Sequence, residues 1–183
     1  MSKKEFFSEF LKQGSNIGSV TPSSKFLVKK MVEHIQFKNA KCIVELGPGT
    51  GIITLELLKN MPENSILLAF EINKEFCDTL DQIGDKRLKV INDSAEKLED
   101  YLKEYSISKV DYVVSSLPFF MIPNEVVDSI LDLVTRVLNK DGAFIQYQYS
   151  LNAYKKLKTI FKNVDLNFTP MNIPPAFIFT CTI

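Results

Sequence analysis

Ten residues decide the fold of this chain: Cys42-Ile43-Val44-Glu45-Leu46-Gly47-Pro48-Gly49-Thr50-Gly51. The apolar start of this stretch predicts a strand buried on both faces. The residues from Ile52 to Lys59 have helical spacing, so strand, glycine turn and helix is the predicted local structure. Glycines let a backbone turn tightly and approach a ligand, and free N–H groups at a helix start favour a negative group. We therefore expect a small molecule at this turn.

The spacing of the glycines narrows the choice of ligand. Dinucleotide sites carry G-x-G-x-x-G and phosphate loops carry G-x-x-x-x-G-K-[ST], whereas this chain has E-x-G-x-G-x-G with no lysine after it. A phosphate loop is excluded and a nicotinamide site is disfavoured. A plain strand-to-helix turn in another α/β protein is the alternative. The pattern resembles the first motif of class I methyltransferases, which implies S-adenosylmethionine as cofactor and these binding residues: Glu45, Gly47, Gly49, Thr50 and Gly51.

Composition sets the general class. The chain has 183 residues, 45% of them hydrophobic and 24% charged, which suits one globular domain. No apolar run reaches the roughly 18 residues of a membrane span, and the first residues lack a signal-peptide core. We expect a cytoplasmic protein.

The potential metal ligands are few and scattered. Cys42, Cys77 and Cys181 form no C-x-x-C pair, and His34 is the single histidine. We expect reduced cysteines in the core and no metal site.

Charge is unevenly distributed along the chain. Residues 1–41 contain eight lysines and three glutamates, although the whole chain has a net charge of zero. A basic segment on an acidic body suggests a polyanionic partner such as a membrane surface or nucleic acid. A merely solvated helical face is an equal alternative.

The N-terminal segment from Lys3 to Gln13 has the pattern of a short amphipathic helix. Such a helix either packs on the domain or lies in a lipid interface with its lysines toward anionic head groups. The predicted membrane-binding residues are Lys3, Lys4, Phe6, Phe7, Phe10 and Leu11. A loop follows, and Thr21 and Pro22 suggest the N-cap and first position of a second helix that extends to about Gln36. We divide the chain into N-terminal helices, residues 1–40, and a core domain, residues 41–183.

The core domain alternates strands and helices. Further strands are predicted at Ile66–Glu71, Leu88–Asp93, Val110–Ser115, Gly142–Tyr149, Val164–Met171 and Ala176–Thr182, and further helices at Lys74–Ile83, Ala95–Tyr105, Asn124–Leu138 and Ala153–Phe161. This alternation predicts a mostly parallel sheet covered on both faces. Only four residues separate the last two strands, so these must form an antiparallel hairpin. The predicted fold is therefore α/β and Rossmann-like, with seven strands, a C-terminal hairpin and N-terminal helices, as in class I methyltransferases.

Acidic residues follow the second and third strands of the predicted sheet. In open α/β sheets, ligands bind beyond the carboxyl ends of the strands. Glu71 is placed to accept hydrogen bonds from ribose hydroxyls, and the resemblance implies that Asp93 binds the adenine amino group. Asp93 could instead cap the helix that follows it. The predicted cofactor set is completed by neighbouring residues: Ile72, Ser94, Ala95 and Ser115.

The fourth strand leads into the predicted acceptor loop, Ser116-Leu117-Pro118-Phe119. Methyltransferases of base amino groups have Asn or Asp, then Pro-Pro or Leu-Pro, then an aromatic residue. Ser116 replaces the Asn or Asp, and no basic helical segment follows the predicted sheet, which weighs against RNA. Tyr147 and Tyr149 are tentative acceptor residues that could hold cationic intermediates, although strand packing explains them equally well.

The N-terminal segment, the glycine motif and the acceptor loop together resemble bacterial phospholipid N-methyltransferases. This resemblance implies methylation of phosphatidylethanolamine and its partly methylated forms by a peripheral membrane enzyme. One alternative is an rRNA adenine N6-methyltransferase. Another is a non-catalytic cofactor-binding protein that docks on a membrane or a protein.

Overall fold

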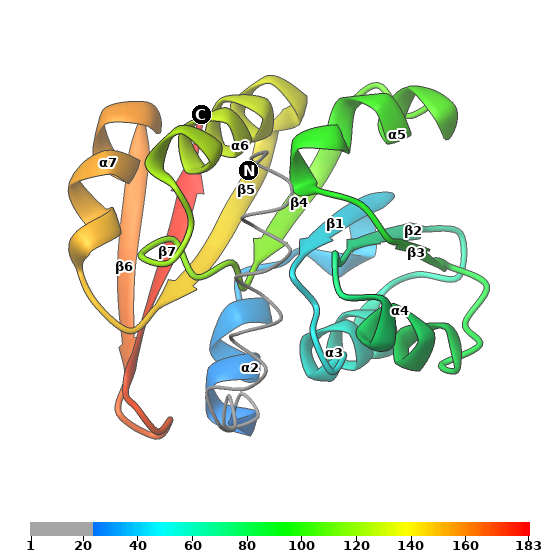
Figure 1. Ribbon diagram of the computed structural model, residues 1–183, viewed down its shortest axis with the longest axis horizontal. Coiled ribbons are helices and arrows are strands. Elements are labelled where there is room, and N and C mark those ends of the chain that lie inside the picture. Colours follow the sequence, from blue (N-terminus) through cyan, green and yellow to red (C-terminus); the bar gives the residue numbers. More distant parts are fainter. Residues whose placement is uncertain (1–23) are drawn as a thin grey trace.

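A seven-stranded sheet runs through the part of the chain that the structure, a computed structural model, describes: residues 24–183 (Figure 1). The strand order is β3-β2-β1-β4-β5-β7-β6. The strands are β1 (Cys42–Leu46), β2 (Ile66–Phe70), β3 (Leu88–Ile91), β4 (Val110–Ser115), β5 (Leu138–Gln148), β6 (Asn163–Thr169) and β7 (Ala176–Thr182). Strands β1 to β5 pair in parallel, and β7 is antiparallel to both β5 and β6. The predicted fold is confirmed.

Helices cover both faces of this sheet. They are α2 (Lys25–Val32), α3 (Ile52–Asn60), α4 (Lys74–Asp81), α5 (Leu98–Glu104), α6 (Asn124–Val137) and α7 (Asn152–Ile160), with short 3-10 turns at η1 (Phe37–Asn39) and η2 (Ala95–Lys97). Each helix buries one apolar stripe, and in α6 that stripe includes Val127, Ile130, Leu131 and Val134.

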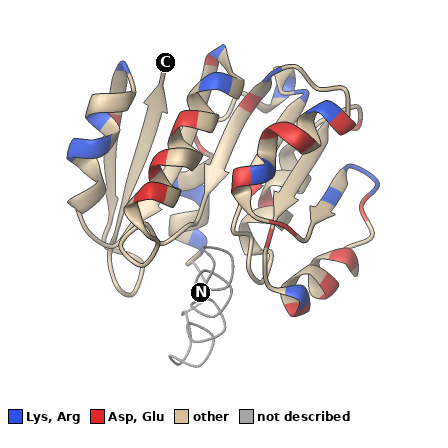
Figure 2. Cartoon of the chain, turned by 45° about the horizontal axis from the view of Figure 1, so that its top comes forward, with Lys and Arg blue, Asp and Glu red and all other residues tan. Residues whose placement is uncertain are grey.

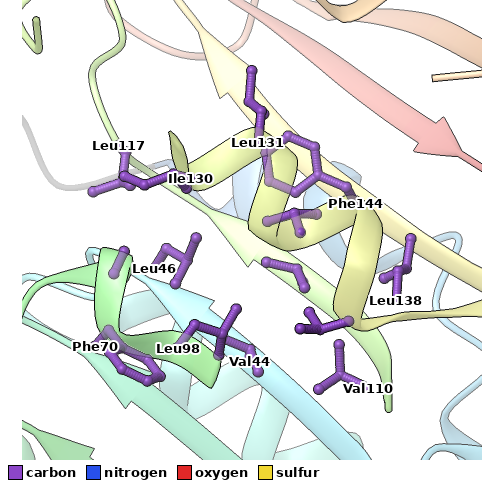
Figure 3. Close-up of a cluster of buried hydrophobic side chains, with 14 of the residues drawn as sticks. Val44, Leu46, Phe70, Leu98, Val110, Leu117, Ile130, Leu131, Leu138 and Phe144 are labelled. Atoms are coloured by element: carbon purple, nitrogen blue, oxygen red, sulfur yellow. The ribbon is translucent and has the colours of Figure 1, made fainter. Parts of the chain in front are cut away.

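One face of the sheet packs against α5, α6 and α7. Val44, Leu46 and Phe144 contribute apolar side chains from three strands, and Leu98 and Ile130 contribute from the helices (Figure 3). All five are at most 1% exposed. This cluster fixes α6, the helix that follows the acceptor loop.

The other face packs against α2 and α3. Leu27 and Met31 of α2 are fully buried against residues such as Ile43, Ile145 and Ile178. The basic segment therefore contributes α2 to the core, with Lys25 and Lys29 on its exposed side.

The α2 helix begins later than predicted. Ser24 has an extended backbone, and its hydroxyl accepts from the Leu27 N–H at 3.2 Å, so Ser24 is the N-cap. The predicted cap Thr21 and Pro22 lie outside the described residues. A helix that continued from Pro22 would need helical geometry at Ser24, so that predicted start is wrong.

Helix α2 ends at Val32, whereas the sequence predicts an end near Gln36. Two further elements differ by more than a residue or two. The predicted helix Ala95–Tyr105 is split into η2 and α5. Strand β5 begins at Leu138, directly after α6, because Leu138 pairs with Val110 before the register shifts to Tyr112 opposite Ala143. At Gly142 the backbones of β5 and β4 lie so close that an added Cβ would be 2.5 Å from the Asp111 carbonyl oxygen.

The predicted helix Lys3–Gln13 and its membrane-binding residues lie outside the described residues. Within residues 24–183, no helix has the length and apolar character needed to cross a membrane.

Candidate active site

The glycine turn follows β1 directly and opens α3. Gly47, Gly49 and Gly51 all have positive φ, at 72°, 54° and 83°. A Cβ on Gly51 would lie 2.8 Å from Cδ2 of the buried Leu80, whereas a Cβ on Gly49 would meet no atom within 4 Å. The turn is therefore packed on its inner side at Gly51 and open at Gly49, as a backbone that approaches a ligand must be.

Glu71 joins the second strand end to this turn. Its Oε2 accepts from the Gly49 N–H at 3.0 Å, and its Oε1 accepts from the Asn73 N–H at 2.8 Å. Burial raises the pKa of the Glu71 carboxyl, and the N–H donors of Asn73, Gly49 and Ile72 oppose that rise. The structure thus brings together two predicted cofactor residues that are 22 positions apart.

Glu45 lies beneath α3 and is fully buried. Its Oε2 accepts from the Thr54 hydroxyl at 2.7 Å, while Oε1 has no hydrogen-bond partner among the described residues. Burial raises the pKa of Glu45 to about 8; the Thr54 hydrogen bond lowers it and the charge of Glu71 raises it further. A buried carboxyl oxygen without a partner is costly unless a ligand or water satisfies it.

Asp93 stands at the third strand end, half-buried. Its Oδ1 accepts from the Ser94 N–H at 2.7 Å, and its Oδ2 accepts from the Tyr101 hydroxyl at 3.3 Å. The cap of η2 is Ser94, whose side chain accepts from the Glu96 N–H, so capping does not account for Asp93. Tyr101 was not predicted from the sequence; it fixes Asp93 and packs edge-on against Phe70.

The acceptor loop contacts the glycine turn. The Ser116 N–H donates to the Leu46 carbonyl at 2.9 Å, and the Leu117 N–H donates to the Ser115 hydroxyl at 3.3 Å. A Cβ on Gly47 would lie 3.1 Å from Cδ2 of Leu117. Leu117 itself points into the core beside Leu46 and Ile130 (Figure 3). The predicted cofactor and acceptor segments are therefore adjacent.

Two glutamines of β5 hold the acceptor loop. Nε2 of Gln146 and Nε2 of Gln148 both donate to the Leu117 carbonyl, at 3.1 and 2.8 Å. Both side chains are buried, and Gln146 Oε1 has no partner among the described residues. A carbonyl oxygen has two lone pairs, so both acceptor positions of the Leu117 carbonyl are already filled by donors within the protein. The sequence signal for these residues was two amides at i and i+2 in an apolar strand.

A cavity of about 280 Å³ lies beside the loop. Phe119 is 8% exposed and Phe120 is 66% exposed. Both line the cavity, together with Asn124, Val127, Gln148, Ser150, Asn152, Ala153 and Lys156. Phe119 therefore presents only part of its ring to the cavity, and Phe120 forms its open rim.

Tyr147 and Tyr149 lie with the α2 face of the sheet. Tyr147 is 8% exposed, Tyr149 packs against the same cluster, and their rings meet edge-on with centroids 5.6 Å apart. Neither lines the cavity at Phe119. Their assignment to the acceptor site stays a prediction.

Comparisons with known proteins agree with this geometry. A family model for ribosomal RNA adenine dimethylase matches residues 15–157. The chain belongs to this family. An ornithine lipid N-methyltransferase from Singulisphaera acidiphila is 31% identical over 96% of this chain and 93% of that protein. A ribosomal RNA small subunit methyltransferase A from Mycoplasma capricolum is 30% identical over 61% of this chain and 42% of that protein.

Solved structures of methyltransferases share the fold of this adenine dimethylase family member. A precorrin-6y C5,15-methyltransferase from Geobacter metallireducens superposes with a TM-score of 0.67 at 16% identity, over 86% of this chain and 88% of that one. The chain is thus a class I methyltransferase that uses S-adenosylmethionine.

The residues at the three strand ends fit that cofactor. Gly49 leaves space above the turn, Glu45 Oε1 has no hydrogen-bond partner within residues 24–183, and Glu71 and Asp93 offer carboxylate oxygens for hydroxyl and amino groups. In the described part of the chain, no three His, Cys, Asp or Glu residues are grouped closely enough to hold a metal ion.

Proposed function

We propose that this methyltransferase acts on the amine of a phospholipid head group, namely phosphatidylethanolamine and its partly methylated forms. The observation that carries the proposal is the extent of the similarity to a lipid enzyme. The ornithine lipid N-methyltransferase aligns over 96% of this chain and 93% of its own length, whereas the M. capricolum rRNA enzyme aligns over 42% of its own length. The alignment with the lipid enzyme therefore extends through the acceptor loop, Ser116–Phe119, and most of the strands that follow it.

The residues of the acceptor loop favour the amine of a flexible molecule over a nucleic-acid base as the substrate. Ser116 replaces the Asn or Asp of base methyltransferases, and its half-buried hydroxyl forms no side-chain hydrogen bond with the described residues. A hydroxyl can accept one hydrogen bond from an amine. The adjoining Phe119 is largely buried in the core, which leaves little ring face for stacking on a base.

The chemistry asks the protein to supply a neutral amine. A primary ammonium resembles lysine, with a pKa near 10.4, so on the order of one molecule in a thousand is neutral at pH 7. The apolar surroundings of Phe119 and Phe120 favour the neutral form by desolvation, and Ser116 orients it. Bound S-adenosylmethionine supplies the electrophilic methyl group.

Ornithine lipid is a second candidate substrate. The relative with the most extensive alignment reported above carries that name, and the amine of such a lipid would pose the same protonation problem. An adenine of rRNA is the third candidate, favoured by the family model over residues 15–157. A non-catalytic docking module is set aside, because the family and its relatives are methyltransferases.

We further propose peripheral attachment at the cytoplasmic face of a membrane. The predicted residues are Lys3, Lys4, Phe6, Phe7, Phe10 and Leu11, and each lysine near an anionic surface contributes on the order of 1 kcal/mol. Deleting residues 1–13 should reduce sedimentation with anionic vesicles and leave cofactor affinity nearly unchanged. Unaltered sedimentation would contradict this part of the proposal.

The proposal is tested by incubating the purified protein with methyl-labelled cofactor and one acceptor at a time. The acceptors are phosphatidylethanolamine vesicles, ornithine lipid vesicles and ribosomal RNA. We expect label in phosphatidylethanolamine, and much less of it with the Glu71→Ala variant at low cofactor concentration, with exposed Glu75→Ala as the matched control. Label in ornithine lipid alone would move the assignment to the second candidate, and label in RNA alone would overturn the lipid proposal.

A further inference from the structure

The tip of the β6–β7 hairpin is an apolar surface. Ile173 is 79% exposed, Met171 is 58% exposed and Phe168 is 49% exposed. Phe26, 53% exposed, lies in the first turn of α2, two residues after Ser24, whose N–H donates to Asn172 of the hairpin tip. We call these four residues the tip patch. Met171 and Ile173 lie at the hairpin tip itself, whereas Phe168, which packs on Phe177 on the α7 face of the sheet, and Phe26 of α2, on the other face, lie behind it. Two large apolar side chains exposed at one turn, with two more behind them, are more than the scattered single exposures that are normal on protein surfaces.

The hairpin holds this exposure in place. Asn172 is 3% exposed; its Oδ1 accepts from the Ser24 N–H at 2.9 Å and its Nδ2 donates to the Pro174 carbonyl at 2.8 Å. The polar side chain therefore faces inward while its neighbours Met171 and Ile173 face outward. This is the reverse of the arrangement that water favours in a turn.

Charges flank the tip patch and are absent from the hairpin tip itself. No charged residue occurs from Leu166 to Ile183, and Figure 2 shows the loop between β6 and β7 without acidic or basic colour. Lys25 and Lys29 are exposed on α2, which contains no acidic residue. An uncharged apolar tip with lysines beside it complements an anionic lipid interface.

The tip patch lies at the edge of the sheet where the acceptor cavity opens. Gln148, the last residue of β5 and part of the cavity lining, pairs with Phe177 at the start of β7. Neighbouring strands are about 4.8 Å apart, so the tip emerges close to the end of β5. Exposed Leu151 follows β5 at this same edge, and Phe120 forms the cavity rim.

We propose that the tip patch inserts into the interfacial layer of an anionic lipid bilayer, with Lys25 and Lys29 at the head groups. The inference rests on the proposed function, because a lipid amine has to reach the cavity from a bilayer. Insertion at this edge brings the cavity mouth to the head-group layer. The proposal adds a contact surface in the described core to the predicted N-terminal helix.

The first experiment removes the apolar contact. Vesicles of phosphatidylethanolamine and phosphatidylglycerol are floated with the full chain and with the double variant Met171→Ser/Ile173→Ser. Each buried aliphatic side chain changes partitioning by on the order of tenfold, so the double variant should bind much more weakly, with unchanged cofactor affinity. Ile183→Ser is the matched control, since Ile183 is 38% exposed and follows the opposite end of β7.

The second experiment removes the charges. Lys25→Gln/Lys29→Gln should weaken binding about fivefold per lysine on anionic vesicles and little on phosphatidylcholine vesicles. Lys140→Gln, an exposed lysine in the amino-terminal part of β5, is the control.

Other occupants of the tip patch would give different results. Unchanged flotation of Met171→Ser/Ile173→Ser would overturn the proposal. A wild-type dimer that this double variant converts to a monomer in light scattering would assign the patch to a second copy. Equal losses of Tm from the double variant and from deletion of residues 1–23 would assign it to that segment. Wild-type vesicle binding without lipid methylation would instead defeat the proposed function and leave the docking surface standing.

Discussion

The sheet has a cofactor half, strands β1 to β3, and an acceptor half, strands β4 to β7, and the two halves hold their functional residues by different contacts. At the ends of β1 and β2, Glu71 is fixed by backbone N–H groups of Gly49 and Asn73. At the ends of β4 and β5, the Leu117 carbonyl is fixed by the side chains of Gln146 and Gln148. Backbone donors are available to any sequence that forms the turn, whereas side-chain donors depend on residue identity. The cofactor half can therefore stay constant in a fold that serves many acceptors, and the acceptor half can change.

The largest expected effect concerns Glu45, the buried acid of the cofactor half. Its pKa of about 8 lies above the ordinary value of 4.5, so the unfolded chain ionises first as pH rises. The contribution of Glu45 to stability is therefore fully present below pH 4.5, falls between pH 4.5 and 8, and is constant above that range. The free energy of unfolding falls by at most about 1.4 kcal/mol per pH unit, which amounts to roughly 4 kcal/mol from pH 5 to 8.

Glu45→Gln cannot ionise, so its stability relative to the wild type should increase over this pH range in urea unfolding. A constant difference from pH 5 to 9 would contradict the assignment. Thr54→Val sharpens the test, because the Thr54 hydroxyl hydrogen bond lowers the pKa of Glu45. Without this hydrogen bond the pKa of Glu45 is higher, so the free energy of unfolding should continue to fall at higher pH.

The next effect tests how tightly the glycine turn is packed. Gly51→Ala places a Cβ at φ 83° and 2.8 Å from Cδ2 of Leu80, which is fully buried. We expect a loss of about 2 to 4 kcal/mol in the free energy of unfolding, from the unfavourable backbone and the overlap. Gly84→Ala, at φ 68° with the nearest atom 4.0 Å away, isolates the backbone part and should lose about 1 to 2 kcal/mol. Equal losses of unfolding free energy in the two variants would mean that the Leu80 side chain moves aside at little cost.

Glu71→Ala tests the cofactor half directly. Hydrogen bonds to charged groups contribute about 1.5 to 3 kcal/mol each, so losing the carboxylate should weaken binding of S-adenosylmethionine by roughly a hundredfold. Calorimetry measures the affinity, and circular dichroism checks that the variant remains folded. Glu75→Ala, exposed on α4, should bind as the wild type does. An unchanged Kd for Glu71→Ala would contradict the ribose role.

A sequence motif records the strand ends of the cofactor half, whereas no motif records the Gln146 and Gln148 contacts that hold the acceptor loop, and the reason is the range of the contacts. Glu45, the glycines and Glu71 follow apolar strands at spacings that a motif records. The start of α2 and the start of β5 were predicted wrongly, because contacts between residues far apart in the sequence determine both. The hydrogen bond between Ser24 and Asn172, 148 positions apart, supports an N-cap at Ser24, three residues after the predicted cap Thr21. The pairing of Leu138 with Val110 begins β5 inside an apolar run that also continues the pattern of α6.

The smallest expected effect, that of Gln148→Leu, distinguishes the acceptor half from the cofactor half most clearly. Gln148→Leu removes one of the two donors to the Leu117 carbonyl and leaves the bond from Gln146 in place, so the fold should persist. The acceptor loop then loses one support, and we expect methyl transfer to phosphatidylethanolamine vesicles to fall about tenfold, as for a hydrogen bond of about 1.4 kcal/mol. Cofactor affinity by calorimetry should stay within a factor of two to three, because Gly49, Glu71 and Asp93 are untouched. Gln82→Leu, on the exposed end of α4, is the matched control. A parallel loss of cofactor affinity in Gln148→Leu would show that the contact between Leu117 and Gly47 couples the halves, and the division between them would fail.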